Sequence, residues 1–291
     1  MALKKKIVLL GDSAVGKTSL IRRYVFNQFE FSYVSTVGSK VTKKKLTIPA
    51  PNKTVDITFM IWDIIGREGY HALHARTFVG VHGAILVTDL TRKETLENLE
   101  KYWIPFLLKV VKKVPMVFVC NKSDLTGEYE FEFEELEEIA QRYNDAVDEI
   151  LPAELKSCYL TSAKDGLNVE KAFETLGHFV LTASSLQDPV KKISEVLKAT
   201  SIRRTTDKTT PIGALDAIIV DFCEDFNDSR ISMIILRQEI ARAGINIDSP
   251  TKEGIFKVVE YLAEAEHEFI DEEKVFSNLE KRMEWAKKIQ E

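Results

Sequence analysis

Gly11-Asp-Ser-Ala-Val-Gly16-Lys17-Thr18 follows the apolar run of residues 7–10 and precedes a segment with helical spacing. A strand, a glycine-containing loop and a helix, in this order, are the setting that the G-x-x-x-x-G-K-[ST] pattern requires. The two glycines let backbone N–H groups turn toward phosphate oxygens. The helix that follows directs the positive end of its dipole to the same place. The segment therefore predicts a loop that binds the phosphates of a nucleotide.

Two side chains at the end of this loop have separate expected roles. Lys17 would reach the β- and γ-phosphates, and the hydroxyl of Thr18 would ligate magnesium. The alternative is an ordinary glycine turn, but a chance match in a chain of this length is on the order of one per cent. The loop residues expected to contact nucleotide are Ser13, Ala14, Val15, Gly16, Lys17, Thr18 and Ser19.

The composition is typical of an intracellular globular protein. The 291 residues suffice for one large and one small domain, and the net charge of −5 argues against a nucleic-acid partner. No apolar run approaches the length of a membrane span, and the first residues lead directly into a strand rather than a leader. Three widely spaced cysteines, Cys120, Cys158 and Cys223, suit neither a disulfide framework nor a zinc site. We therefore expect a cytoplasmic protein without a transmembrane segment.

Short apolar runs alternate with helical patterns over the first 182 residues, which predicts a mainly parallel sheet covered by helices. The expected strands are residues 4–10, 40–48, 55–63, 83–89, 115–121 and 156–162. The expected helices are residues 17–27, 92–112, 132–151 and 168–184. Lysines at positions 43, 44 and 45 indicate that the second strand is a water-facing edge.

Polar motifs follow three of the predicted strands. At the end of the third strand, the carboxylate of Asp63 can hold magnesium through water, and the N–H of Gly66 can meet a γ-phosphate. After the fifth strand, Asp124 can accept hydrogen bonds from both the ring N–H and the exocyclic amine of guanine. Adenine cannot offer both donors, which disfavours an ATPase. The expected base-contacting residues are Asn121, Lys122 and Asp124, with Ser162, Ala163 and Lys164 after the sixth strand.

With four motifs in this order, the chain resembles a small GTPase of the Ras superfamily, most closely its Rab and Ras branches. The resemblance covers about residues 1–182 and implies a P-loop GTPase fold, a six-stranded sheet flanked by helices. It implies bound GTP or GDP with Mg²⁺, and partners that include protein effectors, an activating protein or an exchange factor. The two switch loops of this family change partners when the γ-phosphate is lost.

The resemblance also assigns residues whose roles have simpler alternatives. Phe29 would stack on guanine, or else only cover a hydrophobic patch. Tyr33 and Thr36 would belong to the first switch, with Thr36 as a γ-phosphate sensor, or else Thr36 lies in an ordinary polar loop. The expected metal ligands are Thr18, Thr36 and Asp63. The expected catalytic residues are Lys17, Thr36, Gly66 and Arg67.

The second switch departs from the family pattern, which usually has a glutamine where this chain has Arg67. A guanidinium has five donors and no acceptor, so it cannot accept a hydrogen bond from the attacking water. Arg67 is either a solvated residue on a mobile loop or a group that stabilises transition-state charge. In both cases we expect slow GTP hydrolysis, and the alternative is a non-hydrolysing GTP-bound scaffold. Ile64 and Ile65 would either exclude water or serve as buried packing.

The resemblance ends near residue 184. We expect a GTPase domain at residues 1–184, a helix and polar linker at 185–212, and a small all-α bundle at 213–291. The expected bundle helices are residues 213–227, 229–243, 249–269 and 271–289. The bundle would pack on the first domain or recruit a partner. An acidic segment, residues 128–138, is either a solvated helix start or a docking surface for a basic partner. The last cysteine is Cys223, so no prenylation box and no lipid anchor are expected.

Overall fold

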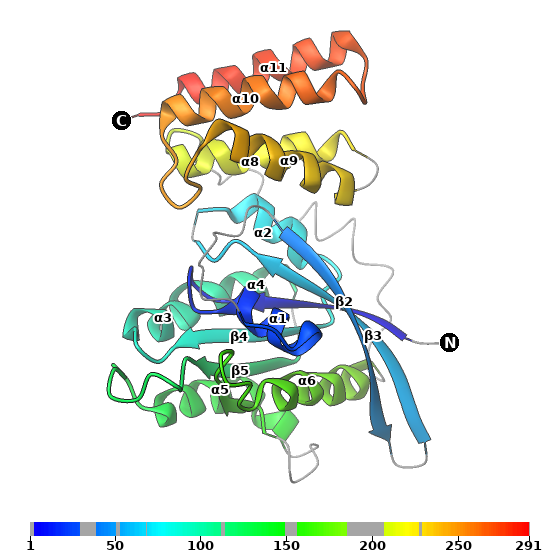
Figure 1. Cartoon of the computed structure of the whole chain (residues 1–291), viewed down its shortest axis with the longest axis vertical. Helices are drawn as coiled ribbons and strands as arrows, with labels where there is room; N and C mark the ends of the chain where they lie inside the picture. The colour runs from blue at the N-terminus through cyan, green and yellow to red at the C-terminus, as the bar shows by residue number, and fades with distance from the viewer. Residues whose placement is uncertain are drawn as a thin grey trace. The chain divides into compact units, whose positions relative to one another are not determined.

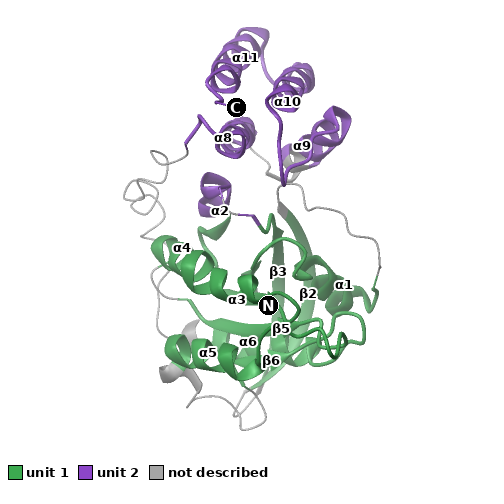
Figure 2. Cartoon of the chain, turned by 90° about the vertical axis from the view of Figure 1, so that its left-hand side faces the viewer, with its two compact units in different colours: residues 1–36, 40–66, 77–199 green, residues 37–39, 67–76, 200–291 purple. Residues whose placement is uncertain are grey.

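A computed structural model of the chain describes residues 3–29, 39–50, 53–67, 69–111, 114–148, 156–184, 207–226 and 229–290. The chain forms two compact units, coloured green and purple in Figure 2. Unit 1 contains residues 1–36, 40–66 and 77–199. Unit 2 contains residues 37–39, 67–76 and 200–291, so it combines the C-terminal part with two short segments that are distant in the sequence.

Unit 1 is built around a six-stranded sheet in the order β2-β3-β1-β4-β5-β6 (Figure 1). Parallel pairing joins β1 to β3 and β4, β4 to β5, and β5 to β6. Strands β4 and β5 are buried along their whole length, which explains their uninterrupted apolar sequences. The predicted α/β architecture is confirmed. The strands are β1 Leu3–Leu10, β2 Ser39–Ala50, β3 Lys53–Ile64, β4 Gly83–Asp89, β5 Met116–Asn121 and β6 Cys158–Leu160.

Helices cover this sheet. Helices α1 and α6 contribute to one apolar cluster with β1, β3, β4 and β5, and the ring of Tyr24 stacks on Phe173 with ring centroids 3.9 Å apart. The sequence pattern did not predict α2, because its eight residues include two histidines, an arginine and a threonine and show no clear apolar stripe. The helices outside the C-terminal region are α1 Lys17–Phe26, α2 His71–Phe78, α3 Lys93–Asn98, α4 Ile104–Val110, α5 Phe133–Asp148 and α6 Val169–Ser184.

The single helix predicted over residues 92–112 is divided. A π-helical turn, η1 (Leu99–Trp103), separates α3 from α4. Pro105 lies in the first turn of α4, where its missing N–H breaks the regular α-helical ladder. The wider π turn accommodates this interruption, so the chain stays helical from α3 to α4. Such turns occur frequently at functional sites.

The C-terminal part of unit 2 is a bundle of four helices, α8 Pro211–Glu224, α9 Ser229–Ala243, α10 Lys252–Glu266 and α11 Glu272–Lys287 (Figure 1). These helices confirm the predicted all-α extension. Side chains of Thr210, Thr251 and Asp271 accept N-capping hydrogen bonds at α8, α10 and α11. The helix predicted within residues 185–212 and most of the polar linker lie outside the described residues. Among the described residues, none of the helices is long and apolar enough to cross a bilayer.

Candidate functional site

The phosphate loop connects the end of β1 to α1. Gly16 has φ 102°, and a Cβ at this position would collide with the side-chain amide of Asn121, so glycine is needed for both reasons. Lys17 is 6% exposed, and its Nζ donates hydrogen bonds of 2.7 Å to the carbonyl oxygens of Gly11 and Asp12. The loop therefore holds its lysine against two of its own backbone carbonyls, at the start of a helix.

Two predicted magnesium ligands lie together. Thr18 Oγ1 donates a hydrogen bond to Asp63 Oδ2 at 2.6 Å, joining the first turn of α1 to the end of β3. A hydroxyl and a carboxylate are hard oxygen donors of the type that Mg²⁺ prefers, so the pair fits that ion. A Cβ added to Gly66 would collide with Lys17 Nζ and with Asp12 O. The backbone at Gly66 therefore runs directly against the phosphate loop.

The loops after β5 and β6, which carry the residues predicted to contact the base, meet at the phosphate loop. Asn121 Nδ2 donates to Val15 O at 2.8 Å, while Asn121 Oδ1 accepts from the N–H of Ala163 at 3.1 Å. Asp124 Oδ1 accepts a hydrogen bond of 2.8 Å from Ser162 Oγ. Its other oxygen lies 3.6 Å from the amine of Lys164. One asparagine side chain thus links three loops that are separate in the sequence.

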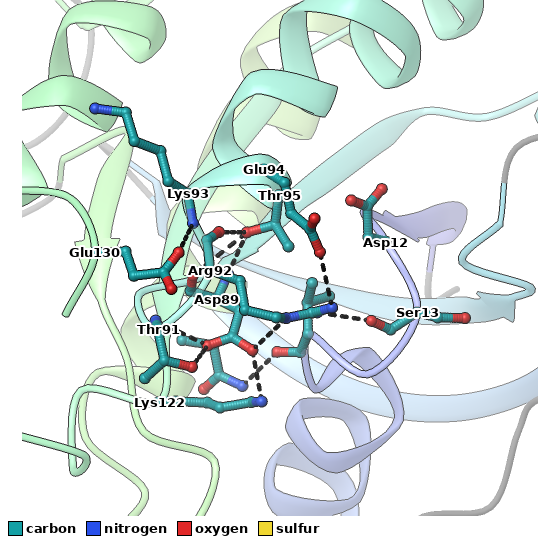
Figure 3. Close-up of polar contacts among 12 residues, drawn as sticks. Asp12, Ser13, Asp89, Thr91, Arg92, Lys93, Glu94, Thr95, Lys122 and Glu130 are labelled. Atoms are coloured by element: carbon teal, nitrogen blue, oxygen red, sulfur yellow. Dashed lines mark hydrogen bonds and ion pairs between the residues drawn. The ribbon is translucent and has the colours of Figure 1, made fainter. Parts of the chain in front are cut away.

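Asp89, at the end of β4, organises a second set of contacts (Figure 3). It is 0% exposed and accepts hydrogen bonds from Thr91 Oγ1 at 2.7 Å and from Arg92 Nε at 3.0 Å, while Lys122 Nζ lies 2.5 Å away. Burial alone would raise the pKa of Asp89. The hydrogen bonds from Lys122 and Thr91, together with the charge of Lys122, outweigh burial and lower that pKa. Asp89 is therefore a buried anion that orients two cations, a role that the sequence patterns did not reveal.

Some of the predicted site residues lie outside the described residues, and others are buried or half-buried in the protein interior. Tyr33 and Thr36 are outside the described residues. Phe29 is half-buried against the apolar cluster of unit 1, as its simpler alternative requires. Ile64 and Ile65 are both 1% exposed, which favours the packing interpretation. Arg67 buries its Nε, which has no hydrogen-bond partner among the described residues.

The segment 67–76 directly follows Gly66 and belongs to unit 2, where helix α8 binds it (Figure 2). The backbone N–H groups of Ala72 and Leu73 donate to the two carboxylate oxygens of Asp216 at 2.8 and 3.0 Å. Arg76 donates to the carbonyl oxygens of Val220 and Cys223 at 3.2 and 3.1 Å. Asp216 therefore acts as the N-terminal cap of α2, although it comes from a distant helix.

Burial dominates the electrostatics of this contact. Asp216 is 0% exposed, and burial raises its pKa to about 7, against the opposing effect of the two N–H groups. Tyr70 donates its hydroxyl proton to Ile247 O at 2.8 Å, and burial, followed by the charges of Asp216 and Asp248, raises its pKa. The only sequence signal for this contact was an acidic residue, Asp216, between the apolar residues Leu215 and Ala217 of α8.

A phosphate loop between β1 and α1, with three further loops converging on it, defines the class of P-loop nucleotide-binding proteins. The family model described as Ras family matches residues 6–182. The Ras-related protein RABA4d of Arabidopsis thaliana is 35% identical over 171 residues, 59% of this chain and 70% of the relative. Rab-1 of Theileria parva is 30% identical over 207 residues, 71% of this chain and 84% of the relative. This chain belongs to the Ras family of small GTP-binding switch proteins. The family match ends before α8.

Proposed function

We propose that this chain is a magnesium-dependent GTP switch with slow intrinsic hydrolysis, and that its C-terminal helices bind the second switch. The observation that carries the nucleotide site is the pair of hydrogen bonds made by the Asn121 side chain, one donated to Val15 O and one accepted from the N–H of Ala163. They join the phosphate loop to the base-contacting loop after β6. A ligand that bridges these loops must carry phosphates at one end and a hydrogen-bonding base at the other.

In this proposal each part of the ligand has its own protein contacts. Lys17 and the loop N–H groups bind the β- and γ-phosphates, and Asp124 selects guanine. Thr18, Thr36 and Asp63 would hold Mg²⁺, which neutralises charge on the phosphate oxygens. Gly66 would sense the γ-phosphate through its N–H. The remaining proposed nucleotide contacts are Phe29, Tyr33, Lys122, Ser162, Ala163 and Lys164.

Titration calorimetry with GDP and ADP, each with Mg²⁺, tests this function. We expect clear preference for GDP in the native chain and a reduction of that preference by about a hundredfold in Asp124→Ala, because two hydrogen bonds to a charged acceptor are lost. Asp165→Ala, in the loop after β6, is the control and should keep the preference. Equal affinity of the native chain for GDP and ADP would overturn the proposed function.

The role of Arg67 has a kinetic test. Single-turnover hydrolysis of bound GTP is expected to accelerate by about tenfold or more in Arg67→Gln, because a glutamine carbonyl can accept a hydrogen bond from the attacking water. If Arg67 takes no part in hydrolysis, Arg67→Ala and the native chain should hydrolyse GTP at the same rate. A slower Arg67→Gln enzyme would show that Arg67 promotes hydrolysis, and our expectation would then be wrong.

A non-hydrolysing GTP-bound scaffold is the second candidate, and the contacts of segment 67–76 with α8 favour it. A segment fixed by hydrogen bonds at Asp216 and Arg76 is less free to orient water. Multiple-turnover phosphate release separates the two candidates. Limited proteolysis in the GDP state and with a non-hydrolysable GTP analogue then tests whether nucleotide alters segment 67–76. We also propose effectors and an activating protein or exchange factor as partners, to be sought by affinity capture in each nucleotide state.

A further inference from the structure

Two phosphate-loop residues are held by a single segment that contacts them from α3 and η1. Arg92 Nη2 donates a hydrogen bond to Ser13 O at 2.7 Å. Asn98 Nδ2 donates to Asp12 Oδ2 at 2.7 Å, and Trp103 Nε1 donates to Asp12 Oδ1, also at 2.7 Å. We call Arg92, Asn98 and Trp103 the loop clamp. Its three hydrogen bonds end on the loop itself, on one backbone carbonyl and one carboxylate.

A second contact, to Asp89, orients the guanidinium group of Arg92 toward the phosphate loop. Its Nε donates to the buried carboxylate of Asp89 at 3.0 Å, so the guanidinium plane is fixed at one end while Nη2 bonds Ser13 O at the other (Figure 3). The same Asp89 oxygen lies 2.5 Å from Lys122 Nζ. Lys122 has φ 68°, an unusual conformation for a residue with a side chain, which the ion pair helps to maintain. Asp89 and Arg92 thus connect the base-contacting loop after β5 to the phosphate loop.

The other two residues of the loop clamp, Asn98 and Trp103, donate their hydrogen bonds to the side chain of Asp12. Both of its carboxylate oxygens accept short hydrogen bonds, and its backbone carbonyl accepts one from Lys17 Nζ at 2.7 Å. Trp103 is 0% exposed and is the last residue of the π turn. Its indole N–H would be costly to bury without an acceptor, and Asp12 supplies that acceptor. The carbonyl that positions Lys17 therefore belongs to a residue whose side chain cannot rotate freely.

We propose that the loop clamp consists of positioning residues that hold the phosphate loop in its nucleotide-binding shape and thereby set the lifetime of the bound nucleotide. This inference rests on the proposed GTP-binding function. None of the three side chains needs to touch the ligand, because each acts through Asp12 or Ser13. A preorganised loop loses less conformational freedom on binding, and it must be distorted before the phosphates can leave. Loosening the clamp therefore accelerates release.

The test measures the release of a fluorescent GDP analogue after addition of excess unlabelled GDP. Asn98→Leu keeps a branched side chain of similar size and removes the N–H donor to Asp12, and Arg92→Ala removes the contact to Ser13 O. Each is expected to accelerate release by about tenfold, the value of one hydrogen bond to a charged or well-oriented acceptor. Arg92→Lys, which cannot bond Asp89 and Ser13 through one rigid fork, should not restore the native rate. Lys93→Ala is the matched control, since Lys93 Nζ pairs with Glu135 instead.

Two further measurements separate positioning from general stability. The ³¹P chemical shifts of bound GDP should change in Asn98→Leu, while its preference for GDP over ADP and the melting temperature of the nucleotide-free protein stay close to native. Native release rates in both variants would overturn the inference and leave the proposed function intact. Faster release with unchanged ³¹P shifts and a matching fall in melting temperature would also overturn it. Failure of the native chain to bind GDP would instead overturn the proposed function.

Discussion

Lys17→Ala is expected to weaken the binding of GDP by about a thousandfold, the largest effect that we predict for one substitution. The Lys17 ammonium is almost completely buried among the backbone carbonyls of its own loop. On binding, it would exchange these neutral acceptors for the negatively charged phosphates. Two charge-assisted contacts to oxygens of the β-phosphate, of about 2 kcal/mol each, correspond to this factor. Calorimetry or competition with fluorescent GDP measures it directly.

The control for this prediction is another lysine of unit 1. Lys101 lies in η1, is exposed, and pairs with Glu97 at 2.6 Å on the protein surface. Lys101→Ala should therefore leave GDP affinity unchanged, because a surface ion pair contributes little. If Lys17→Ala bound GDP within about threefold of the native affinity, the phosphates would not lie in this loop. Melting curves of the nucleotide-free proteins exclude a general folding defect.

Asp216→Ala is expected to release segment 67–76 from helix α8. The substitution leaves two backbone N–H groups, at Ala72 and Leu73, without their acceptor, and buried donors of this kind cost about 1–3 kcal/mol each. Hydrogen exchange at these two amides should accelerate by about a hundredfold or more. The matched control is Asp221→Ala, on the same helix but paired with Arg282 at 2.9 Å. It should destabilise the bundle without selectively exposing α2.

The same carboxyl gives the stability of unit 2 a recognisable pH dependence. The pKa of Asp216 is raised from 3.8 to about 7, so between these values the folded protein holds a proton that the unfolded chain has lost. Stability contributed by this group is therefore present at low pH and falls as the pH rises toward 7, by at most about 1.4 kcal/mol per pH unit. Asp216→Asn should flatten that part of the curve. An equal slope in Asp216→Asn and the native chain would assign the effect to other groups.

Local sequence pattern was enough to predict much of the secondary structure of this protein. Gly11–Thr18 predicted a strand, a loop and a helix, because the pattern depends on neighbouring residues and not on distant ones. Residues 229–243 matched α9 without any shift, since an apolar stripe and flanking polar residues define such a helix. The prediction of one continuous helix at residues 92–112 was wrong in detail. Pro105 interrupts the α-helical ladder and a π turn precedes it, and the spacing of apolar residues does not report such an interruption.

The sequence by itself determined the α/β class, the order of the nucleotide motifs and the presence of a helical extension. These properties follow from short-range spacing of glycines, apolar residues and charged residues along the chain. Only the tertiary structure decided that Arg92, Asn98 and Trp103 hold the phosphate loop, and that Asp216 caps α2. Such contacts join residues tens of positions apart. They exist because buried carboxylates and indole N–H groups must find partners wherever the folded chain brings one within reach.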